Sequence, residues 1–190
     1  MDFVLSKEHE MARTLFREFA EKEVKPLAAE IDETERFPTE TVDKLKKYGF
    51  LGIPFPKEVG GQGCDTLTYV MCVEELSKVC ATTGVIVSAH TSLGTDPIKK
   101  FGTPLQQEKY LKKLASGEYL GAFGLTEPGA GTDASGQQTL AVLEGDHYVL
   151  NGSKLSLIHI SDLASRSGLP EGNFFRISFV FPLDFSGKIL

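Results

Sequence analysis

The periodicity of the apolar residues changes near Gly117, and this change constrains the fold more than any other feature of the sequence. Before it, apolar side chains recur at every third or fourth position, which is typical of amphipathic helices that bury one face. After it, the runs 139–143 and 148–150 flank Glu144-Gly-Asp146, a pattern that predicts two strands joined by a turn. The sequence therefore predicts an α+β fold, with an all-α helical domain at residues 1–118 and the start of a β domain at residues 119–154.

The first helix is expected to begin with Ser6 as its N-cap and to continue as far as Ile31. Pro26 has no amide hydrogen to donate, so it should kink this helix or divide it. The buried face is predicted from the spacing of five apolar side chains, which are Met11, Leu15, Phe19, Leu27 and Ile31.

A second helix is expected from Pro38 to Gly49, and a third after Asp65, whose carboxylate should cap it. The segment between them, residues 51–63, is rich in proline and glycine and is predicted to be a loop. The second helix should present Val42, Leu45 and Tyr48 to the core. The third is predicted to turn Leu67, Val70, Met71 and Leu76 inward and to leave Glu74, Glu75 and Lys78 in solvent.

Residues 83–93 are apolar through their first half, which indicates a buried helix, although the β-branched residues leave a strand as the alternative. Thr103-Pro-Leu-Gln106 combines an N-cap, a proline at the first helical position and a capping-box glutamine. This is the clearest helix start in the sequence. The helix that follows is expected to bury Leu111 and Leu114 and to end near Gly117.

The composition is that of a folded protein and excludes some functions. With 190 residues, 41% of them hydrophobic, the chain can bury a core. A net charge of −6 argues against a nucleic-acid or anionic-membrane partner. There is no signal peptide and no apolar run of about 18 residues, and Cys64, Cys72 and Cys80 lack the spacing of zinc ligands. The sequence therefore predicts a cytoplasmic protein with reduced thiols, no metal site and no membrane span.

The segment 121–135 is the strongest candidate for a ligand site. It concentrates glycine, threonine and proline in one short polar turn, and Gly129 and Gly131 can take backbone conformations that are closed to other residues. Thr126, Thr132 and free backbone N–H groups can donate hydrogen bonds. Such a loop suits a flat, hydrogen-bonding cofactor, and the alternative interpretation is an ordinary surface loop.

Several motifs resemble those of acyl-CoA dehydrogenases, in the order and spacing of that family. Leu125-Thr-Glu-Pro-x-Ala-Gly-Thr-Asp133 is similar to the family's flavin-binding signature. The other matches are Ile53-Pro-x-Pro-x-Glu-x-Gly-Gly-x-Gly63, Glu74-Glu-Leu-Ser-Lys-x-Cys-Ala-x-Thr-Gly84 and Gly145-Asp-x-Tyr-x-Leu-Asn-Gly-x-Lys154. The resemblance extends from Phe3 to Lys154 and is greatest with the short-chain, butyryl-CoA-type members.

The resemblance implies that the β domain is the start of a β-barrel-like middle domain, truncated in this chain, and that its loop binds FAD. The implied cofactor-binding residues are Phe123, Gly124, Leu125, Thr126, Glu127, Pro128, Gly129, Ala130, Gly131 and Thr132. Leu125 and Thr126 are expected along the pyrimidine edge of the flavin, and Thr132 matches a Ser/Thr that contacts phosphate or pantetheine. For the acyl-CoA substrate, the implied binding residues are Thr132 and the pocket-lining Ser88, Ala89 and His90. A hydrogen-bonded structural histidine is the ordinary interpretation of His90.

For a complete enzyme the resemblance implies oxidation of an acyl-CoA to the trans-2-enoyl-CoA, with proton removal by a base and hydride transfer to the flavin. In the short-chain branch that base is a glutamate of the C-terminal helical domain, which this chain lacks. Glu127 belongs to the flavin loop and is not expected to be the base. No catalytic residue is therefore assigned, and the chain alone is expected to be inactive. The implied partners are electron-transferring flavoprotein and, at full length, three further copies in a homotetramer.

Residues 155–190 depart from the family, which continues after Asn-Gly-x-Lys with an aromatic residue, Ile-Thr-Asn and a second flavin-contacting segment. Here Leu155-Ser-Leu-Ile-His-Ile-Ser161 stands in that place. These residues match the translation of an adaptor left by transposon-based sequencing libraries. Our hypothesis is that the tail is an artefactual, foreign reading frame. The alternative is a genuine divergent segment in which residues 174–183 form an extra strand.

Two functions of other classes stay open at this point. The acidic helical half of the chain is also consistent with a non-catalytic helical interaction module that binds a protein partner. A nonfunctional truncated product without a stable fold is the other alternative.

Overall fold

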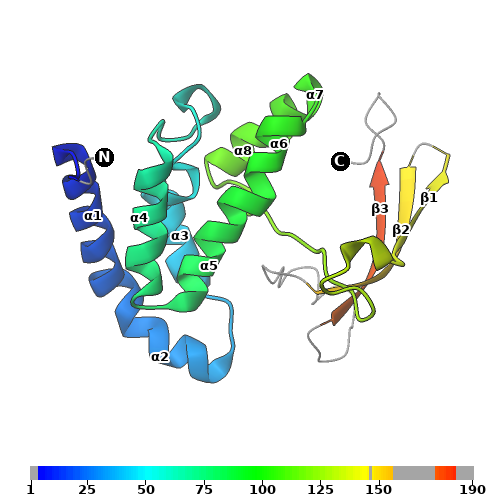
Figure 1. Cartoon of the computed structure of the whole chain (residues 1–190), viewed down its shortest axis with the longest axis horizontal. Helices are drawn as coiled ribbons and strands as arrows, with labels where there is room; N and C mark the ends of the chain where they lie inside the picture. Colours follow the sequence, from blue (N-terminus) through cyan, green and yellow to red (C-terminus); the bar gives the residue numbers. More distant parts are fainter. Residues whose placement is uncertain (1–3, 146, 156–173, 183–190) are drawn as a thin grey trace. The chain divides into compact units, whose positions relative to one another are not determined.

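The structure, a computed structural model, describes residues 4–145, 147–155 and 174–182 (Figure 1). The chain divides into two compact units, Met1–Gly121 and Ala122–Leu190. The first unit is helical, and the second contains a small antiparallel sheet. This is the α+β fold class that the sequence predicts.

Helix α1 (Lys7–Phe19) begins the helical unit, and Ser6 caps it because its Oγ accepts the N–H of His9 at 3.2 Å. A π-helical turn at Ala20–Val24 follows, and α2 (Lys25–Thr34) begins with Pro26 in its first turn. The backbone stays helical through this wider turn, in which the Lys25 N–H donates to the Ala20 carbonyl, and the interruption accommodates a proline that has no N–H to donate. Pro26 therefore divides the predicted helix, as expected.

The buried face of α1 differs from the predicted one. Met11 is 73% exposed and Leu15 47% exposed, whereas Phe16 and Phe19 are buried. Phe19 and Ile31 of the predicted face are buried as expected, and Met11 and Leu15 were wrong. The core takes Phe16 in their place, whose ring removes a large apolar area from water.

Helix α3 (Thr39–Lys47) follows Pro38 and ends before Gly49, as predicted. Gly49 has a φ of +72°, in the left-handed region where a glycine ends a helix without strain. The predicted loop after it contains two short 3-10 turns, Phe50–Gly52 and Lys57–Val59.

Helix α4 (Thr66–Ser77) begins at the predicted cap, because an Asp65 carboxylate oxygen accepts the N–H of Thr68 at 2.8 Å. Its buried residues are Thr68, Met71, Cys72, Glu75 and Leu76. The inward orientation of Leu67 and Val70 was wrong, since they are 44% and 51% exposed. Val70 lies on the side of the helix away from the buried residues, and Leu67 lies at the edge of the buried face, one turn before Met71.

The expectation that Glu75 is solvated was also wrong, because this side chain is only 3% exposed. Arg17 of α1 donates from Nε to Oε2 at 3.0 Å and from Nη2 to Oε1 at 3.1 Å, and Lys78 Nζ lies 3.0 Å from Oε1. A buried carboxylate requires such partners to offset its lost hydration. Glu75 therefore joins α1 to α4.

The segment after α4 is helical, which settles the choice between helix and strand. Its elements are α5 (Ala81–Ala89), a π-helical turn (His90–Thr95), α6 (Asp96–Phe101), α7 (Pro104–Gln106), a second such turn (Gln107–Leu111) and α8 (Lys112–Ala115). The predicted capping box is present, with the Thr103 N–H donating to Gln106 Oε1 at 2.8 Å and the Gln106 N–H to Thr103 Oγ1 at 3.3 Å. Leu111 and Leu114 are buried as predicted.

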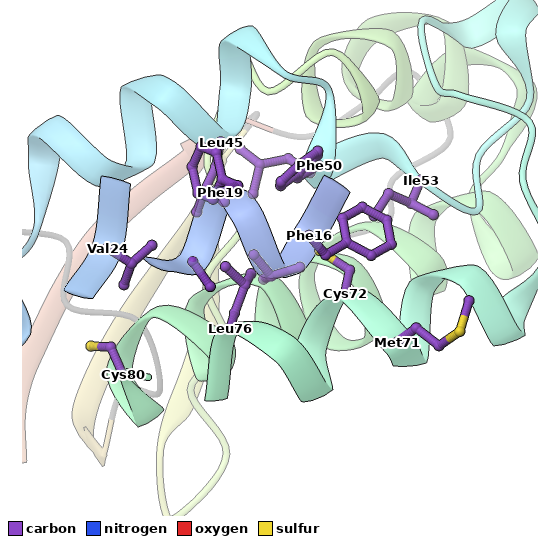
Figure 2. Packing of buried hydrophobic residues seen from close by; sticks show 13 residues of the cluster. Phe16, Phe19, Val24, Leu45, Phe50, Ile53, Met71, Cys72, Leu76 and Cys80 are labelled. Carbon is purple, nitrogen blue, oxygen red and sulfur yellow. The ribbon is translucent and has the colours of Figure 1, made fainter. Parts of the chain in front are cut away.

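The core of the helical unit lies where α1, α4 and the start of the proline-rich loop meet (Figure 2). Phe50 is packed edge-on against both Phe16 and Phe19, with each pair of ring centroids 5.0 Å apart. Leu45 and Leu76 are fully buried in the same cluster. This packing of aromatic rings against aliphatic side chains gives the helical unit a single hydrophobic centre.

The second unit contains β1 (Leu140–Glu144), β2 (His147–Leu155) and β3 (Phe174–Pro182), paired antiparallel in that order. The predicted hairpin between β1 and β2 is present. Asn151 and Gly152 lie inside β2, although an Asn-Gly pair is more typical of a turn. A Cβ atom on Gly152 would lie 2.1 Å from Thr139 Oγ1, so the glycine permits a close approach of neighbouring chain segments.

Strand β1 is exposed along its whole length, and β2 is its one strand neighbour in the described part of the chain. Its apolar side chains Leu140, Val142 and Leu143 are 65%, 49% and 54% exposed.

Strand β3 falls in the part of the sequence that departs from the family. It pairs with β2 from His147 opposite Pro182 to Leu155 opposite Phe174. The structure thus contains the strand that the divergent-segment alternative expected. Residues 156–173, which include most of the adaptor-like sequence, lie outside the described residues, and the origin of the tail stays a prediction.

Candidate functional site

The loop of the candidate site is built around one tight turn in the second unit. The Glu127 N–H donates to the Ala130 carbonyl at 3.1 Å, and the Ala130 N–H donates to the Glu127 carbonyl at 3.1 Å. Pro128 and Gly129 form the exposed corner of this turn. Pro128 suits the corner because it has no N–H that would need a partner there.

The two backbone carbonyls just before this turn, those of Leu125 and Thr126, accept hydrogen bonds from the protein. The Leu125 carbonyl accepts from Gln137 Nε2 at 2.8 Å and from Lys154 Nζ at 3.0 Å. The Thr126 carbonyl accepts the N–H of Leu155 at 2.8 Å. These two carbonyls are therefore used within the chain and are not the groups that the loop offers to a ligand.

The Glu127 carboxylate is buried, with the residue only 6% exposed. It accepts the N–H of Gln138 at 2.6 Å and the N–H of Thr139 at 3.1 Å, and Lys154 Nζ lies 2.8 Å from Oε1. The Gln138 N–H, followed by the Lys154 ammonium and Thr139, lowers the pKa of Glu127 to about 2. Glu127 is therefore ionised at neutral pH and held by three donors, which agrees with the expectation that it is not a base.

Two side-chain hydroxyls of the loop make no hydrogen bond to the described part of the protein. The hydroxyls of Thr126 and Thr132 have no hydrogen-bond partner among the described residues. Thr126 is half-buried and Thr132 is exposed. A Cβ atom built on Gly129 or Gly131 would meet no atom of the described structure within 4 Å.

Gly129 and Gly131 do not have the unusual backbone conformation that the sequence suggested for them. Neither residue has a positive φ, so the backbone conformation does not require glycine at either position. What the two glycines provide is open space beside the turn, in which a ligand can approach the backbone closely. The remaining members of the predicted set differ in exposure, since Phe123 is half-buried and Leu125 is 42% exposed.

The three predicted substrate-pocket residues lie at the end of α5 and the start of the next turn. Ser88 is half-buried, and its carbonyl accepts hydrogen bonds from Tyr69 Oη at 3.2 Å and Ser92 Oγ at 2.7 Å. Ala89 is 4% exposed and His90 is fully buried. These residues belong to the helical unit, and the flavin-loop residues belong to the other unit.

His90 is held by its neighbours through both ring nitrogens. Its Nδ1 accepts the N–H of Gly121 at 2.9 Å, and its Nε2 donates to the Leu114 carbonyl at 3.2 Å, which defines the tautomer. Burial lowers the pKa of His90 to about 4. The imidazole is therefore neutral at physiological pH and fixes Gly121 against the end of the helical bundle, which matches the ordinary structural interpretation.

Sequence reasoning missed the residues that hold the loop. Lys154, Gln137 and the backbone of residues 138 and 139 all bond to residues 125–127. The available signal was Lys154, because it closes the Asn-Gly-x-Lys motif, but its spacing from the loop gave no indication of contact.

The remaining ionisable and sulfur groups give no second site. Cys72 and Cys80 are buried, Cys64 is exposed, and burial raises the pKa of the Cys72 thiol above its usual range. Within residues 4–145, 147–155 and 174–182, no group of three His, Cys, Asp or Glu side chains could hold a metal ion. None of the helices in those ranges combines the length and apolar character needed to cross a bilayer.

Comparison with known families agrees with this geometry. The family described as "Acyl-CoA dehydrogenase, N-terminal domain" matches residues 6–118. The chain belongs to the acyl-CoA dehydrogenase family.

Comparison with curated relatives shows which members of that family the chain is similar to. The chain is 65% identical over 155 residues to the short-chain-specific acyl-CoA dehydrogenase of Clostridium acetobutylicum, which covers 82% of this chain and 41% of the relative. It is 47% identical over 150 residues to the caffeyl-CoA reductase-Etf complex subunit CarC of Acetobacterium woodii, covering 78% of this chain and 40% of the relative. The chain therefore spans about two fifths of the length of the curated relatives it matches.

Solved structures show the same architecture. Butyryl-CoA dehydrogenase from Megasphaera elsdenii is similar with a TM-score of 0.76 and 45% identity, over 82% of this chain and 42% of that one. An acyl-CoA dehydrogenase from Bacillus anthracis, solved in complex with FAD, is similar with a TM-score of 0.73 and 36% identity, over 80% of this chain and 27% of that one.

Proposed function

We propose that this chain is the N-terminal part of an FAD-dependent acyl-CoA dehydrogenase of the short-chain branch. The observation that carries the proposal is the loop at residues 123–132, in which the Leu125 and Thr126 carbonyls accept hydrogen bonds from the protein while the hydroxyls of Thr126 and Thr132 have no partner among the described residues. The 65% identity to a short-chain-specific relative supports the choice of branch.

The loop fits FAD on two observations of this structure. Space is open beside Gly129 and Gly131, and the free hydroxyls can donate to the carbonyl and nitrogen acceptors of a flavin edge or to a phosphate. We assign residues 123–132 to the cofactor, with Leu125 and Thr126 along the pyrimidine edge. When bound, FAD supplies the hydride acceptor for oxidation of the acyl chain. The protein's own part is to bind and orient the cofactor and substrate.

On the substrate side, we assign Thr132 to the phosphate or pantetheine of acyl-CoA, and Ser88, Ala89 and His90 to the border of the acyl pocket. His90 is fully buried and neutral and uses both ring nitrogens on backbone groups, which supports a structural role at this border and not a role as a base. The base is expected from the C-terminal domain of the family, so residues 1–190 are proposed to be inactive alone.

The wider assignments follow from the family and are part of the proposal. The helical domain comprises residues 1–118, the flavin loop and first strands residues 119–154, and residues 155–190 are foreign to both. Electron-transferring flavoprotein is the proposed electron acceptor, supported by a relative named as a subunit of an Etf complex. A homotetramer and a cytoplasmic location are proposed for the full-length enzyme.

A chimera tests the proposal. Residues 1–154 are joined to the remaining sequence of the Clostridium acetobutylicum relative, and the purified protein is examined for flavin absorption and for butyryl-CoA oxidation with an artificial electron acceptor. We expect a yellow protein that oxidises butyryl-CoA. A folded chimera that stays colourless after incubation with FAD would refute the proposal and favour a helical interaction module.

Replacing Thr126 with valine in the same chimera tests the loop itself. Loss of one hydrogen bond costs about 0.5–1.5 kcal/mol, so the Kd for FAD should rise roughly 2–10-fold in a fluorescence titration. Thr82→Val, at an exposed position on α5, is the matched control and should leave the Kd unchanged. Equal FAD affinity in Thr126→Val and the parent would remove Thr126 from the assigned contacts.

A further inference from the structure

We propose that Glu127 and Lys154 are a positioning pair that sets the shape of the flavin loop from behind, without contact to the cofactor. This inference rests on the proposed function, because it concerns the same loop. It assigns an inward, structural role to the acidic residue of the flavin signature. It also adds a residue, Lys154, that lies outside the set assigned to the cofactor.

The Glu127 side chain is directed towards the backbone that leads into β1. Its carboxylate accepts two consecutive backbone N–H groups, those of Gln138 and Thr139, at 2.6 Å and 3.1 Å. These residues are the approach to β1, and the carboxylate is shielded from solvent. Glu127 therefore ties the turn to the strand that follows it, and its oxygens are not available to a ligand.

Lys154 lies at the end of β2, beside the loop. Its side chain is 12% exposed, and its ammonium lies 2.8 Å from Glu127 Oε1 and 3.0 Å from the Leu125 carbonyl oxygen. A Cβ atom on Gly124 would contact the Lys154 Cβ at 3.4 Å, so the aliphatic stem of the lysine runs beside Gly124. One side chain thus contacts three positions of the loop.

Thr126 lies between Leu125 and Glu127, which are both bonded to Lys154. Its own carbonyl accepts the N–H of Leu155 at 2.8 Å, so the backbone is fixed before, at and after this position. Within the described part of the chain, the Thr126 hydroxyl has no hydrogen-bond partner and is the group that we assign to the ligand. Anchoring of this kind holds a contacting group in its bound geometry and lowers the entropic cost of binding.

An ion pair suits this task better than an apolar contact. The ammonium and the carboxylate are both largely shielded, so loss of either one leaves an uncompensated charge and unpaired donors or acceptors. Both charges keep their partners when residues 125–127 stay in their observed position beside the end of β2, so the pair favours that position of the loop. The low pKa of Glu127 supports a pair that stays charged throughout the neutral range.

The test has two readouts that separate the pair from the flavin. In the 190-residue chain, hydrogen exchange is measured at the Gln138 and Thr139 amides in the wild type, Glu127→Gln and Lys154→Met. Glu144→Gln, an exposed carboxylate on β1, is the matched control. We expect faster exchange at both amides in the two pair variants and no change in the control.

In the full-length chimera, the same variants are titrated with FAD, and the visible circular dichroism of the bound flavin is recorded. We expect Glu127→Gln and Lys154→Met to raise the Kd roughly tenfold or more and to alter the flavin spectrum, since small displacements of positioning groups have effects of this order. The double variant should be no worse than either single one. Lys154→Arg, which keeps the charge, should restore most of the affinity and the spectrum.

The outcomes distinguish the two proposals. A parent chimera that binds no FAD would refute the proposed function, while the amide exchange would still report on the pair. A parent that binds FAD, with pair variants that are folded and bind it with the same Kd and spectrum, would overturn the positioning role alone. Unchanged amide exchange in Glu127→Gln would overturn the inward role of Glu127.

Discussion

Among the described residues, Glu75, His90 and Glu127 are buried and engaged by neighbours, and the sequence indicated a structural role for His90 alone. Glu75 is held by Arg17 and Lys78, His90 by backbone groups of Leu114 and Gly121, and Glu127 by Lys154 and two N–H groups. In each case the partner that matters is distant in the chain or is a backbone group. A charged residue at a solvent-like position in a helical pattern gives no indication of such a partner.

Replacing Glu75 with glutamine should destabilise the helical unit. Arg17 and Lys78 lower the pKa of Glu75 to about 2, so its stabilisation is present above the ordinary value of 4.5 and is lost as the pH falls from 4.5 towards 2. Hydrogen bonds to a charged group contribute about 1.5–3 kcal/mol, but Arg17 and Lys78 are 59% and 51% exposed and can turn to water, so we expect a loss of about 1 kcal/mol at pH 7. Urea denaturation followed by circular dichroism at 222 nm measures it. Glu74→Gln, at the more exposed neighbouring carboxylate, is the control. An equally large loss in Glu74→Gln would contradict the stabilising role assigned to Glu75.

Replacing His90 with glutamine should flatten the pH dependence of stability on the acid side. The folded pKa of about 4 lies below the ordinary 6.5, so the unfolded chain binds the proton first and stability falls as the pH drops from 6.5 to 4. Glutamine keeps one donor and one acceptor but does not titrate. Thermal unfolding between pH 6.5 and pH 4.5 should show a smaller drop in Tm for His90→Gln than for the wild type. Parallel curves for the two proteins would show that His90 does not titrate on unfolding.

At the scale of helices and strands, the ends were predictable and the faces were not. Ser6, Asp65 and Thr103 cap their helices as predicted, because a cap depends on residues three positions away. Met11 and Leu67 were assigned to the core and are exposed, because the choice between adjacent apolar rows depends on what packs against the helix. The loop of the candidate site was found through its resemblance to a motif. Its anchor was not, since Lys154 lies 29 residues from Leu125.

The close packing of α5 on α4 depends on Gly84. A Cβ atom there would lie 1.9 Å from Ser77 Oγ and 3.0 Å from Ser77 Cβ. Gly84→Ala should therefore cost about 1–3 kcal/mol through overpacking, despite the better helix propensity of alanine. Denaturant unfolding of Gly84→Ala, Ser77→Gly and the double variant forms a cycle in which Ser77→Gly should recover part of the loss. Additive effects would mean that the two residues do not clash.

At the scale of the whole molecule, the chain is a helical unit with a full core followed by a short sheet unit. The helical unit contains thirteen clustered buried apolar residues, and the family match at residues 6–118 falls within it. The aligned region covers about two fifths of each relative. These facts predict a stable helical unit whose unfolding is cooperative, in contrast to a truncated product without a fold.

Truncating the centre of that core tests its integrity. Leu45 is fully buried, so Leu45→Ala should lower the free energy of unfolding by about 2–5 kcal/mol through the cavity it leaves. Leu67→Ala is the matched change at a 44% exposed position and should alter stability by about 0.5 kcal/mol or less. Chemical denaturation at 222 nm compares the two. Equal small effects would indicate a loosely packed core.

Strand β1 has consequences for how the chain behaves at high concentration. Its outer edge offers backbone groups for pairing, and its leucine and valine side chains stand in water. Edges of this kind nucleate intermolecular β-aggregation, against which natural sheets place lysines. Dynamic light scattering should therefore show particles that grow with concentration well below the melting temperature, and Val142→Lys should suppress them. The same edge would make this polypeptide prone to inclusion bodies when it is overproduced.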